Sequence, residues 1–323
     1  NAGLTSNHII HAGSNILCHL AFLFSALLIH GAAPDDFVHS TIVPIPKGRN
    51  ANLSDSVNYR GISLSSIFCK LLDNIILQRC CSKFLTSELQ FGFKAKCSTN
   101  MCSLVLKETL LYYSNNESSV YCTFLDATKA FDRVHYCKLF SLLIKRGLPP
   151  YIVRLLINMY TGHSVRVCWH GVMSNYFVAA NGVKQGGVLS PVLFCIYIDN
   201  LLYSLKQAGI GCFIGSNFVG SLAYADDLVL LAPSPSALRK MLLICDAYAL
   251  EYNILFNASK SKCIVVLPPS RRYLTTIVKT CTFYVGGCEI EIVDSWLHLG
   301  NTFNCRLDDA DEINNKRNSL VGH

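Results

Sequence analysis

Two aspartates stand side by side within an otherwise largely apolar stretch, at Asp226 and Asp227. The flanking residues 218–225 and 228–231 are typical of two buried strands. Burying two adjacent carboxylates is costly unless a cation neutralises them or water reaches them. The pattern therefore predicts a strand, a tight turn and a second strand, with both carboxylates at the turn. For this short motif in isolation, a solvated hairpin tip is the more common explanation.

A third carboxylate follows another apolar strand. The run from Val120 to Asp126 is predicted to be an apolar strand that ends on the carboxylate of Asp126. If this strand lies beside the hairpin, three carboxylates meet at one end of a sheet. Three carboxylates can hold two divalent ions about 4 Å apart, the arrangement used for in-line phosphoryl transfer. Magnesium suits such a site when substrate phosphates complete it, and manganese is the alternative ion.

A glycine-rich segment, residues 182–191, surrounds Gln185. Its glycines allow backbone to approach a ligand closely, and Ser190 followed by Pro191 is typical of a helix start. The segment matches neither the P-loop nor the dinucleotide fingerprint. Taken alone, it is better interpreted as a structural turn.

Charge and cysteine usage narrow the class of protein. Lys plus Arg is 28 against 21 for Asp plus Glu, and a net charge of +7 favours a polyanionic partner. The 16 cysteines include no Cys-x-x-Cys pair, which argues against a structural zinc cluster. A disulfide scaffold would be a much shorter chain. We therefore expect buried free thiols in a reducing compartment and no disulfide-linked partner.

Helical and alternating patterns follow one another along the chain, which predicts an α+β fold. The predicted helices are residues 9–30, 65 or 66 to 84, 98–113, 138–146, 150–160, 191–205 and 236–251. The predicted strands are residues 40–46, 120–126, 165–169, 176–179, a pair within 218–231, 264–267 and 282–285. Prolines in 40–46 predict an edge strand. The apolar run Ala21 to Ile29 is too short to span a bilayer, so no membrane partner is expected.

Eight segments occur in the order typical of one family. They are Thr41–Lys47, Asn58–Leu64, Gln90–Phe93 with Ser98 and Thr99, Phe124–Asp132, Gly182–Pro191, Tyr224–Asp227, Asn257–Lys260 and Trp296–Gly300. Together they resemble the reverse transcriptase domain of non-LTR (LINE-type) retrotransposons, over nearly the whole chain. Gly61 and Gly187 depart from the commonest family pattern without removing a required functional group.

The resemblance implies a right-hand polymerase, with fingers, a palm built on an antiparallel sheet flanked by helices, and a partial thumb. Residues 1–40 would be a helical extension of the fingers, and residues 41–303 the reverse transcriptase domain. Within it, the fingers would cover about 41–119 and the palm about 120–267. Residues 304–323 would begin a truncated thumb or connection, so the chain is expected to be a fragment.

The resemblance also assigns catalytic and metal-binding roles. Asp126, Asp226 and Asp227 would be the catalytic residues and the ligands of two Mg²⁺ ions, with Asp227 the more peripheral. Lys260 belongs to a motif whose lysine approaches the active site.

Four further residues are implied to bind the incoming nucleotide. Lys47 and Arg60 would reach the triphosphate from the fingers, as basic side chains do. Gln185 would contact the nucleotide and the template–primer. Phe131 would lie beneath the sugar and exclude a 2′-hydroxyl, although its apolar character alone favours plain core packing.

The implied activity is that of an RNA-directed DNA polymerase, which extends a DNA primer on an RNA template with dNTPs. The implied location is intracellular, in the nucleus and cytoplasm as a ribonucleoprotein. An RNA-dependent RNA polymerase is one alternative, against which Phe131 argues. A catalytically inactive nucleic-acid-binding relic is another, against which the intact carboxylates and basic residues argue.

Overall fold

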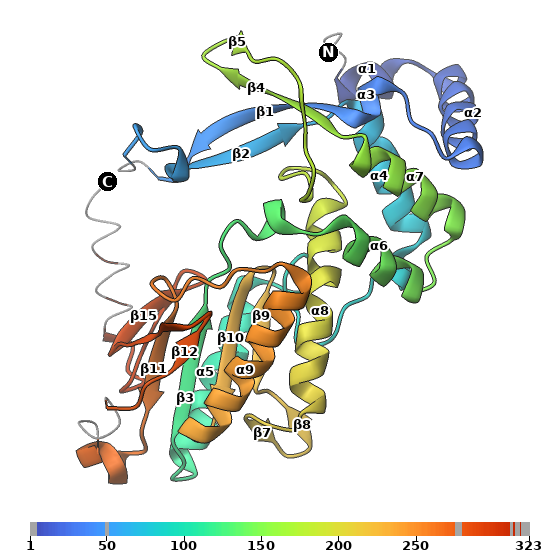
Figure 1. Ribbon diagram of the computed structural model, residues 1–323. Helices are drawn as coiled ribbons and strands as arrows, with labels where there is room; N and C mark the ends of the chain where they lie inside the picture. Colours follow the sequence, from blue (N-terminus) through green and yellow to red (C-terminus); the bar gives the residue numbers. More distant parts are fainter. Residues whose placement is uncertain (1–4, 49–51, 275–279, 311–312, 314–316, 318–323) are drawn as a thin grey trace. The chain divides into compact units, whose positions relative to one another are not determined.

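A computed structural model describes residues 5–48, 52–274, 280–310, 313 and 317 (Figure 1). Contacts divide the chain into two compact units, each made of two segments. The first unit comprises Asn1–Leu85 and Phe131–Tyr197, and the second comprises Thr86–Ala130 and Ile198–His323. Both contain helices and strands, so the predicted α+β class is confirmed. The boundaries of fingers, palm and thumb stay predictions.

The first unit contains a sheet in the order β2-β1-β4-β5, with β6 also paired to β4. Its strands are β1 (His39–Pro46), β2 (Tyr59–Leu64), β4 (Ser164–Trp169), β5 (Val172–Met173) and β6 (Phe177–Val178). Strand β1 pairs with β2 from Thr41 to Pro46 but with β4 only from His39 to Ile42. The predicted edge strand is therefore internal at Thr41 and Ile42, which pair with both neighbours. Its second half, with Pro44 and Pro46, has β2 as its only partner among the described strands, because proline cannot donate to a second neighbour.

Helices of the first unit begin and end largely where local signals predict. They are α1 (Ser6–His11), α2 (Ser14–His30), α3 (Asp35–Val38), α4 (Ile67–Arg79), α6 (Tyr136–Lys145), α7 (Pro150–Thr161) and the first part of α8 (Ser190–Gln207), with the 3-10 turns η1 (Ser56–Asn58), η2 (Cys81–Lys83) and η3 (Ala130–Arg133). The predicted helix 9–30 is interrupted at Gly13, whose φ is 75°. Helix α4 starts after Ser66, whose hydroxyl accepts the Cys69 N–H, and it ends at Arg79, earlier than predicted.

The second unit contains a five-stranded sheet in the order β14-β11-β3-β10-β9. These strands are β3 (Val120–Leu125), β9 (Ser221–Tyr224), β10 (Asp227–Ala232), β11 (Lys262–Val266) and β14 (Glu291–Ile292). Strand β3 lies in the middle, antiparallel to both β10 and β11, and all its residues are buried. The predicted antiparallel sheet is therefore confirmed for four neighbouring strands, while β14 is parallel to β11.

Helices cover this second sheet, and short hairpins extend the unit. Helix α5 (Thr99–Asn115) contacts β3 and β9, and α9 (Pro235–Tyr252) contacts β10 (Figure 1). The remaining elements are the second part of α8, η4 (Pro269–Leu274) and the hairpins β7 (Phe213–Ile214) with β8 (Asn217–Phe218), β12 (Tyr284–Val285) with β13 (Cys288–Glu289), and β15 (Ser295–His298) with β16 (Asn301–Asn304). Ser98 caps α5, its hydroxyl accepting the Met101 N–H.

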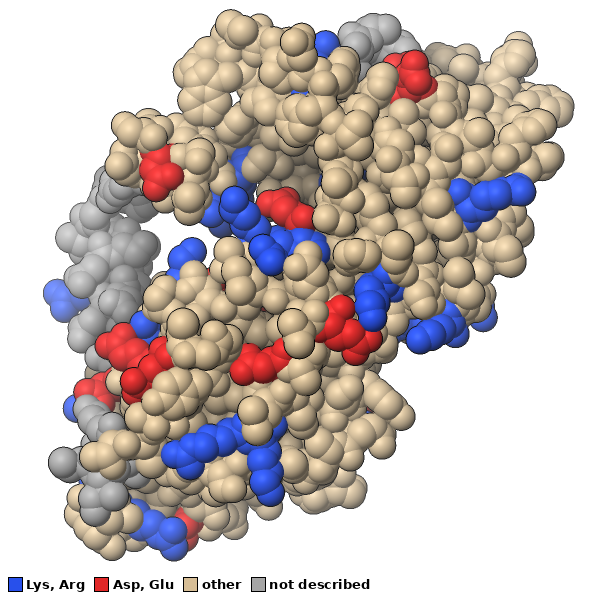
Figure 2. Space-filling view, in the orientation of Figure 1, with Lys and Arg blue, Asp and Glu red and all other residues tan. Residues whose placement is uncertain are grey.

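The structure bears on three expectations from the sequence, which concern surface charge, cysteines and a membrane span. On the face drawn in Figure 2, Lys and Arg side chains of the described residues are interspersed with Asp and Glu side chains. Of the 16 cysteines, all are free thiols and eight are buried, so the packing expectation holds for half of them. Among the described residues, no helix is both long and apolar enough to cross a bilayer.

Candidate active site

Strand pairing brings Asp126 and Asp227 to the same end of the second unit's sheet. In the antiparallel ladder between β3 and β10, Leu125 lies opposite Leu228. Asp126 is the next residue after Leu125, and Asp227 is the residue before Leu228. Because the two strands run in opposite directions, both aspartates lie at the same end of these strands. The predicted convergence of these two distant segments is therefore present at the level of the backbone.

A tight turn between β9 and β10 places Asp226 at the same end of the sheet. Tyr224 pairs with Asp227, so the chain reverses within the two residues Ala225 and Asp226. Ala225 has a φ of 57°, the left-handed conformation that such a reversal requires. Asp226 is half-buried and Asp227 is exposed.

The charges of the three carboxylates influence one another. Partial removal of water from the Asp227 carboxylate, followed by repulsion from Asp226 and Asp126, raises the pKa of Asp227 to about 6. Burial, with a smaller contribution from Asp227, raises the pKa of the Cys102 thiol on α5 to about 12. The site is therefore a cluster of like charges that a cation would stabilise.

Ser261 and Asn257, neither of which was named as a site residue from the sequence, hold the backbone of Asp126. Its N–H donates to the Ser261 hydroxyl at 3.1 Å, and its carbonyl accepts the Asn257 N–H at 2.8 Å. The Ser261 hydroxyl in turn donates to the Asn257 carbonyl at 2.8 Å, and Ser261 is fully buried. The available signal was the polar motif from Asn257 to Lys260 placed just before a strand.

Lys260 belongs to the segment from Asn257 to Ser261 that holds Asp126. Its N–H donates to the Asn257 carbonyl at 3.2 Å, and its side chain is exposed. Asp126, Asp226, Asp227 and Lys260 thus all belong to the second unit.

The first unit carries the four residues expected to bind the nucleotide. Arg60 on β2 lies opposite Ile45 on β1, and the Lys47 N–H donates to the Asn58 carbonyl at 2.8 Å. Lys47 is two residues beyond Ile45, the partner of Arg60, so both basic residues belong to one face of the β1–β2 ribbon. Both side chains are exposed, as a ligand contact requires.

Phe131 and Gln185 lie in segments that contact each other within the first unit. Phe131 is half-buried, and its ring stacks on that of Phe194 with centroids 4.8 Å apart. Its carbonyl accepts the Val183 N–H at 2.8 Å, two residues before Gln185. The Gln185 carbonyl accepts the Ser63 N–H at 2.6 Å, which fixes the glycine-rich segment to β2. Phe131 therefore has both a packed and an accessible face.

Sequence comparison agrees with the geometry. The family model "Reverse transcriptase (RNA-dependent DNA polymerase)" matches residues 45–288. The chain belongs to the reverse transcriptase family. It is 30% identical over 311 residues to the Pol polyprotein of the Drosophila melanogaster retrotransposable element R2DM, covering 93% of this chain and 29% of that protein.

Other reverse transcriptases show the same partial coverage. The R2 Pol polyprotein of Nasonia vitripennis is 27% identical, with 87% of this chain and 28% of that protein covered. The RNA-directed DNA polymerase of the mobile element jockey from Drosophila funebris is 29% identical, with 76% and 27% covered. The predicted resemblance to non-LTR retrotransposon polymerases is confirmed, and the chain spans less than a third of the length of these relatives.

Solved structures show the fold of this reverse transcriptase. Apo telomerase from Candida tropicalis matches with a TM-score of 0.57 at 12% identity, covering 90% of this chain and 52% of that one. A form truncated from the C-terminal domain gives a TM-score of 0.55 at 13% identity, covering 84% and 54%. The predicted right-hand polymerase fold is thereby confirmed.

The carboxylates fit divalent ions in their chemistry. In the part of the chain that the structure describes, no three His, Cys, Asp or Glu side chains form a ready-made metal-binding group. Magnesium, however, is usually held by one or two carboxylates together with substrate phosphates. Hard oxygen donors that repel one another, as Asp126, Asp226 and Asp227 do, are suited to that arrangement.

Removing the Asp227 charge is expected to stabilise the metal-free reverse transcriptase above about pH 6. Its pKa is raised from 3.8 to about 6 in the folded protein, so folding stability falls as pH rises through this window. Asp227→Asn should therefore melt a few degrees higher than the parent at pH 8 in a chelator, and at a similar temperature at pH 4. Thermal melts across this range test it, and saturating Mg²⁺ should reduce the difference. Parallel pH profiles for the two proteins would contradict it.

Proposed function

We propose that this chain is the catalytic core of the RNA-directed DNA polymerase of a non-LTR retrotransposon. It extends the 3′-hydroxyl of a DNA primer with dNTPs on an RNA template and releases pyrophosphate. The observation that carries the proposal is that Asp126 and the Asp226–Asp227 turn lie at the same end of one sheet, in a chain of the reverse transcriptase family.

In this proposal Asp126, Asp226 and Asp227 hold two Mg²⁺ ions, with Mn²⁺ as a substitute. Bound divalent ions would activate the primer hydroxyl and neutralise the triphosphate and the leaving pyrophosphate. The contribution of the protein is to fix the carboxylates, and the hydrogen bonds from Asp126 to Ser261 and Asn257 support that role. Lys260, which lies between Asn257 and Ser261, supplies a positive charge beside the reacting groups.

The remaining residues recognise the nucleotide. Lys47 and Arg60 bind the triphosphate, and their exposure on one face of the β1–β2 ribbon supports this assignment. Gln185 contacts the nucleotide and the template–primer. Phe131 excludes the 2′-hydroxyl, and the packing of its ring on Phe194 supports a rigid wall rather than a mobile one.

The partners and the location follow from the same proposal. The RNA template and the DNA primer are polyanions, in agreement with the net charge of +7. We place the protein inside the cell, in the nucleus and cytoplasm as a ribonucleoprotein, on the family resemblance.

Primer extension tests the proposed activity. The purified chain is given an RNA template and a DNA primer with Mg²⁺ and either dNTPs or rNTPs, and template–primer binding is measured in parallel. We expect extension with dNTPs and little with rNTPs. Preferential use of rNTPs would favour the RNA polymerase alternative, and tight binding without any extension would favour the inactive relic.

A further inference from the structure

A buried glutamine contacts the turn that carries the two adjacent aspartates. Gln90 has no exposed surface, and its side-chain Oε1 accepts two backbone N–H groups. These belong to Gly92, at 2.8 Å, and to Ala225, at 2.9 Å. Two donors aimed at one atom fix the amide orientation, because the flipped amide would set its NH₂ group against both of them.

The backbone around Gln90 runs alongside β9 and ends against the turn. The Ala223 N–H donates to the Leu89 carbonyl at 2.9 Å, and the Phe91 N–H donates to the Ala223 carbonyl at 2.8 Å. At Gly92 a Cβ atom would lie 2.4 Å from the Ala225 nitrogen. Contact this close leaves no room for a side chain, so the segment and the turn can meet only if residue 92 is glycine.

The chemistry of Gln90 is not that of a packing residue. Its Nε2 is buried and has no hydrogen-bond partner within the described chain. A half-satisfied buried amide is unfavourable compared with an apolar side chain of the same shape. What Gln90 provides in place of packing is a hydrogen bond to Ala225, the residue whose left-handed φ of 57° turns the chain into Asp226.

We propose that Gln90 is a positioning residue for Asp226 and Asp227. By holding the Ala225 N–H, it fixes the turn so that both carboxylates are placed for divalent ions before substrate arrives. The inference deepens the proposed function and rests on it for the identity of the metal site. It is separable in experiment, because metal binding can be measured without polymerisation.

The decisive variant is Gln90→Met, which keeps the length of the side chain but removes the acceptor. A Mn²⁺ titration, in which electron paramagnetic resonance measures the free ion, should show that the variant binds Mn²⁺ about tenfold more weakly than the parent, as for residues that orient metal ligands. In primer extension kcat should fall by a similar factor, while KM for template–primer stays at the parent value. Gly92→Ala pushes on the same Ala225 nitrogen and should reproduce both changes.

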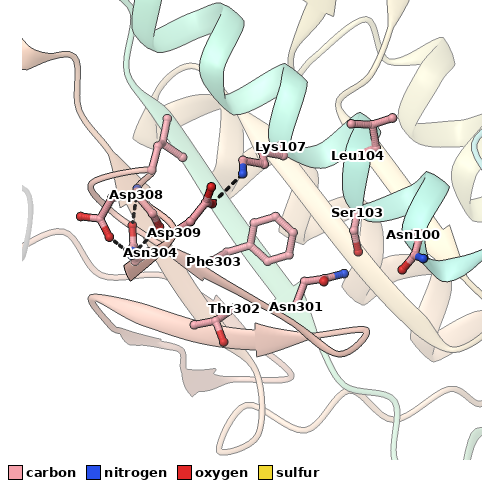
Figure 3. A pocket seen from close by; sticks show the side chains of 11 residues that line it. Asn100, Ser103, Leu104, Lys107, Asn301, Thr302, Phe303, Asn304, Asp308 and Asp309 are labelled. Atoms are coloured by element: carbon pink, nitrogen blue, oxygen red, sulfur yellow. Dashed lines mark hydrogen bonds and ion pairs between the residues drawn. The ribbon is translucent and has the colours of Figure 1, made fainter. Parts of the chain in front are cut away.

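A matched control comes from a second buried amide in the same unit. Asn304 is 3% exposed, and its Oδ1 accepts the N–H groups of Arg306 and Asp308, both at 3.2 Å. It lines a pocket of about 310 Å³ between α5 and β16, where its bonds to Asp308 can be followed in Figure 3. Asn304→Leu removes the same kind of acceptor from a different turn. It should lower the melting temperature and leave Mn²⁺ affinity and kcat unchanged.

The outcomes separate the possibilities. Parent-like Mn²⁺ affinity and kcat in Gln90→Met, with only a lower melting temperature, would overturn the proposal. So would equal weakening of Mn²⁺ binding in Asn304→Leu, or a parent protein that binds no Mn²⁺ through Asp126, Asp226 and Asp227. If the parent binds Mn²⁺ and Gln90→Met weakens it while no extension occurs, the positioning role holds and the proposed polymerase activity fails.

Discussion

Replacing Asp126 with Asn is expected to lower primer extension by about 10³-fold or more while leaving template–primer binding largely intact. The substitution keeps the shape of the side chain and leaves the backbone bonds of residue 126 to Ser261 and Asn257 in place, but it removes a negative charge from the proposed metal site. A loss of about 4 kcal/mol of transition-state stabilisation corresponds to this factor. Binding rests mainly on basic contacts to phosphates, which the variant retains. Single-turnover extension and fluorescence anisotropy measure the two quantities.

The control for charge removal is Asp309→Asn in the same unit. Asp309 pairs with Lys107 at 2.6 Å in an exposed ion pair, which is shown in Figure 3. Exposed pairs contribute little to stability, so this variant should extend primers at the parent rate. Near-parent activity in Asp126→Asn would show that the carboxylates have been assigned wrongly.

Replacing Phe131 with Val is expected to improve use of ribonucleotides relative to deoxynucleotides by about 10- to 100-fold. The argument is steric, because a phenyl ring beneath the sugar leaves no space for a 2′-hydroxyl. The stacking of Phe131 on Phe194 holds the ring in place, and a smaller side chain would open that space. Incorporation efficiencies for matched ribo- and deoxynucleotides on parent and variant give the ratio.

Core packing is the competing explanation for Phe131. It predicts a cavity and a loss of roughly 1–4 kcal/mol in stability, with sugar discrimination unchanged. Phe140→Val provides the comparison, since Phe140 is 6% exposed and its ring lies near those of Tyr136 and Tyr160. It should lose stability without altering the sugar ratio. If Phe131→Val behaves in the same way, the sugar-gate hypothesis is wrong.

Elements with a strong local signal could be predicted from sequence. Ser66 and Ser98 cap the helices that follow them, because an N-cap depends on residues within one turn. The apolar run that precedes Asp126 and the apolar runs around Asp226 and Asp227 form strands where their patterns indicate. Carboxylates in such runs need a partner or water, and three of them together with the family resemblance nominate the candidate metal ligands.

Strand position within a sheet was harder to predict. The prolines of β1 indicated an edge strand, but Thr41 and Ile42 pair with strands on both sides. Proline forbids a donor only at its own position, so it constrains Pro44 and Pro46 but not the pairing of His39 to Ile42 with β4. Which strands become neighbours depends on contacts between distant segments, and a local pattern does not contain that information.

The family, the α+β class and the candidate site residues follow from the sequence, because each depends on residue type and short-range order. How those residues are held follows only from the tertiary fold. The fold sets Leu125 opposite Leu228, places Ser261 and Asn257 on the backbone of Asp126, and seats a buried glutamine against the turn of Asp226. The physical reason is that register, burial and hydrogen-bond partners arise only when segments far apart in the chain pack together.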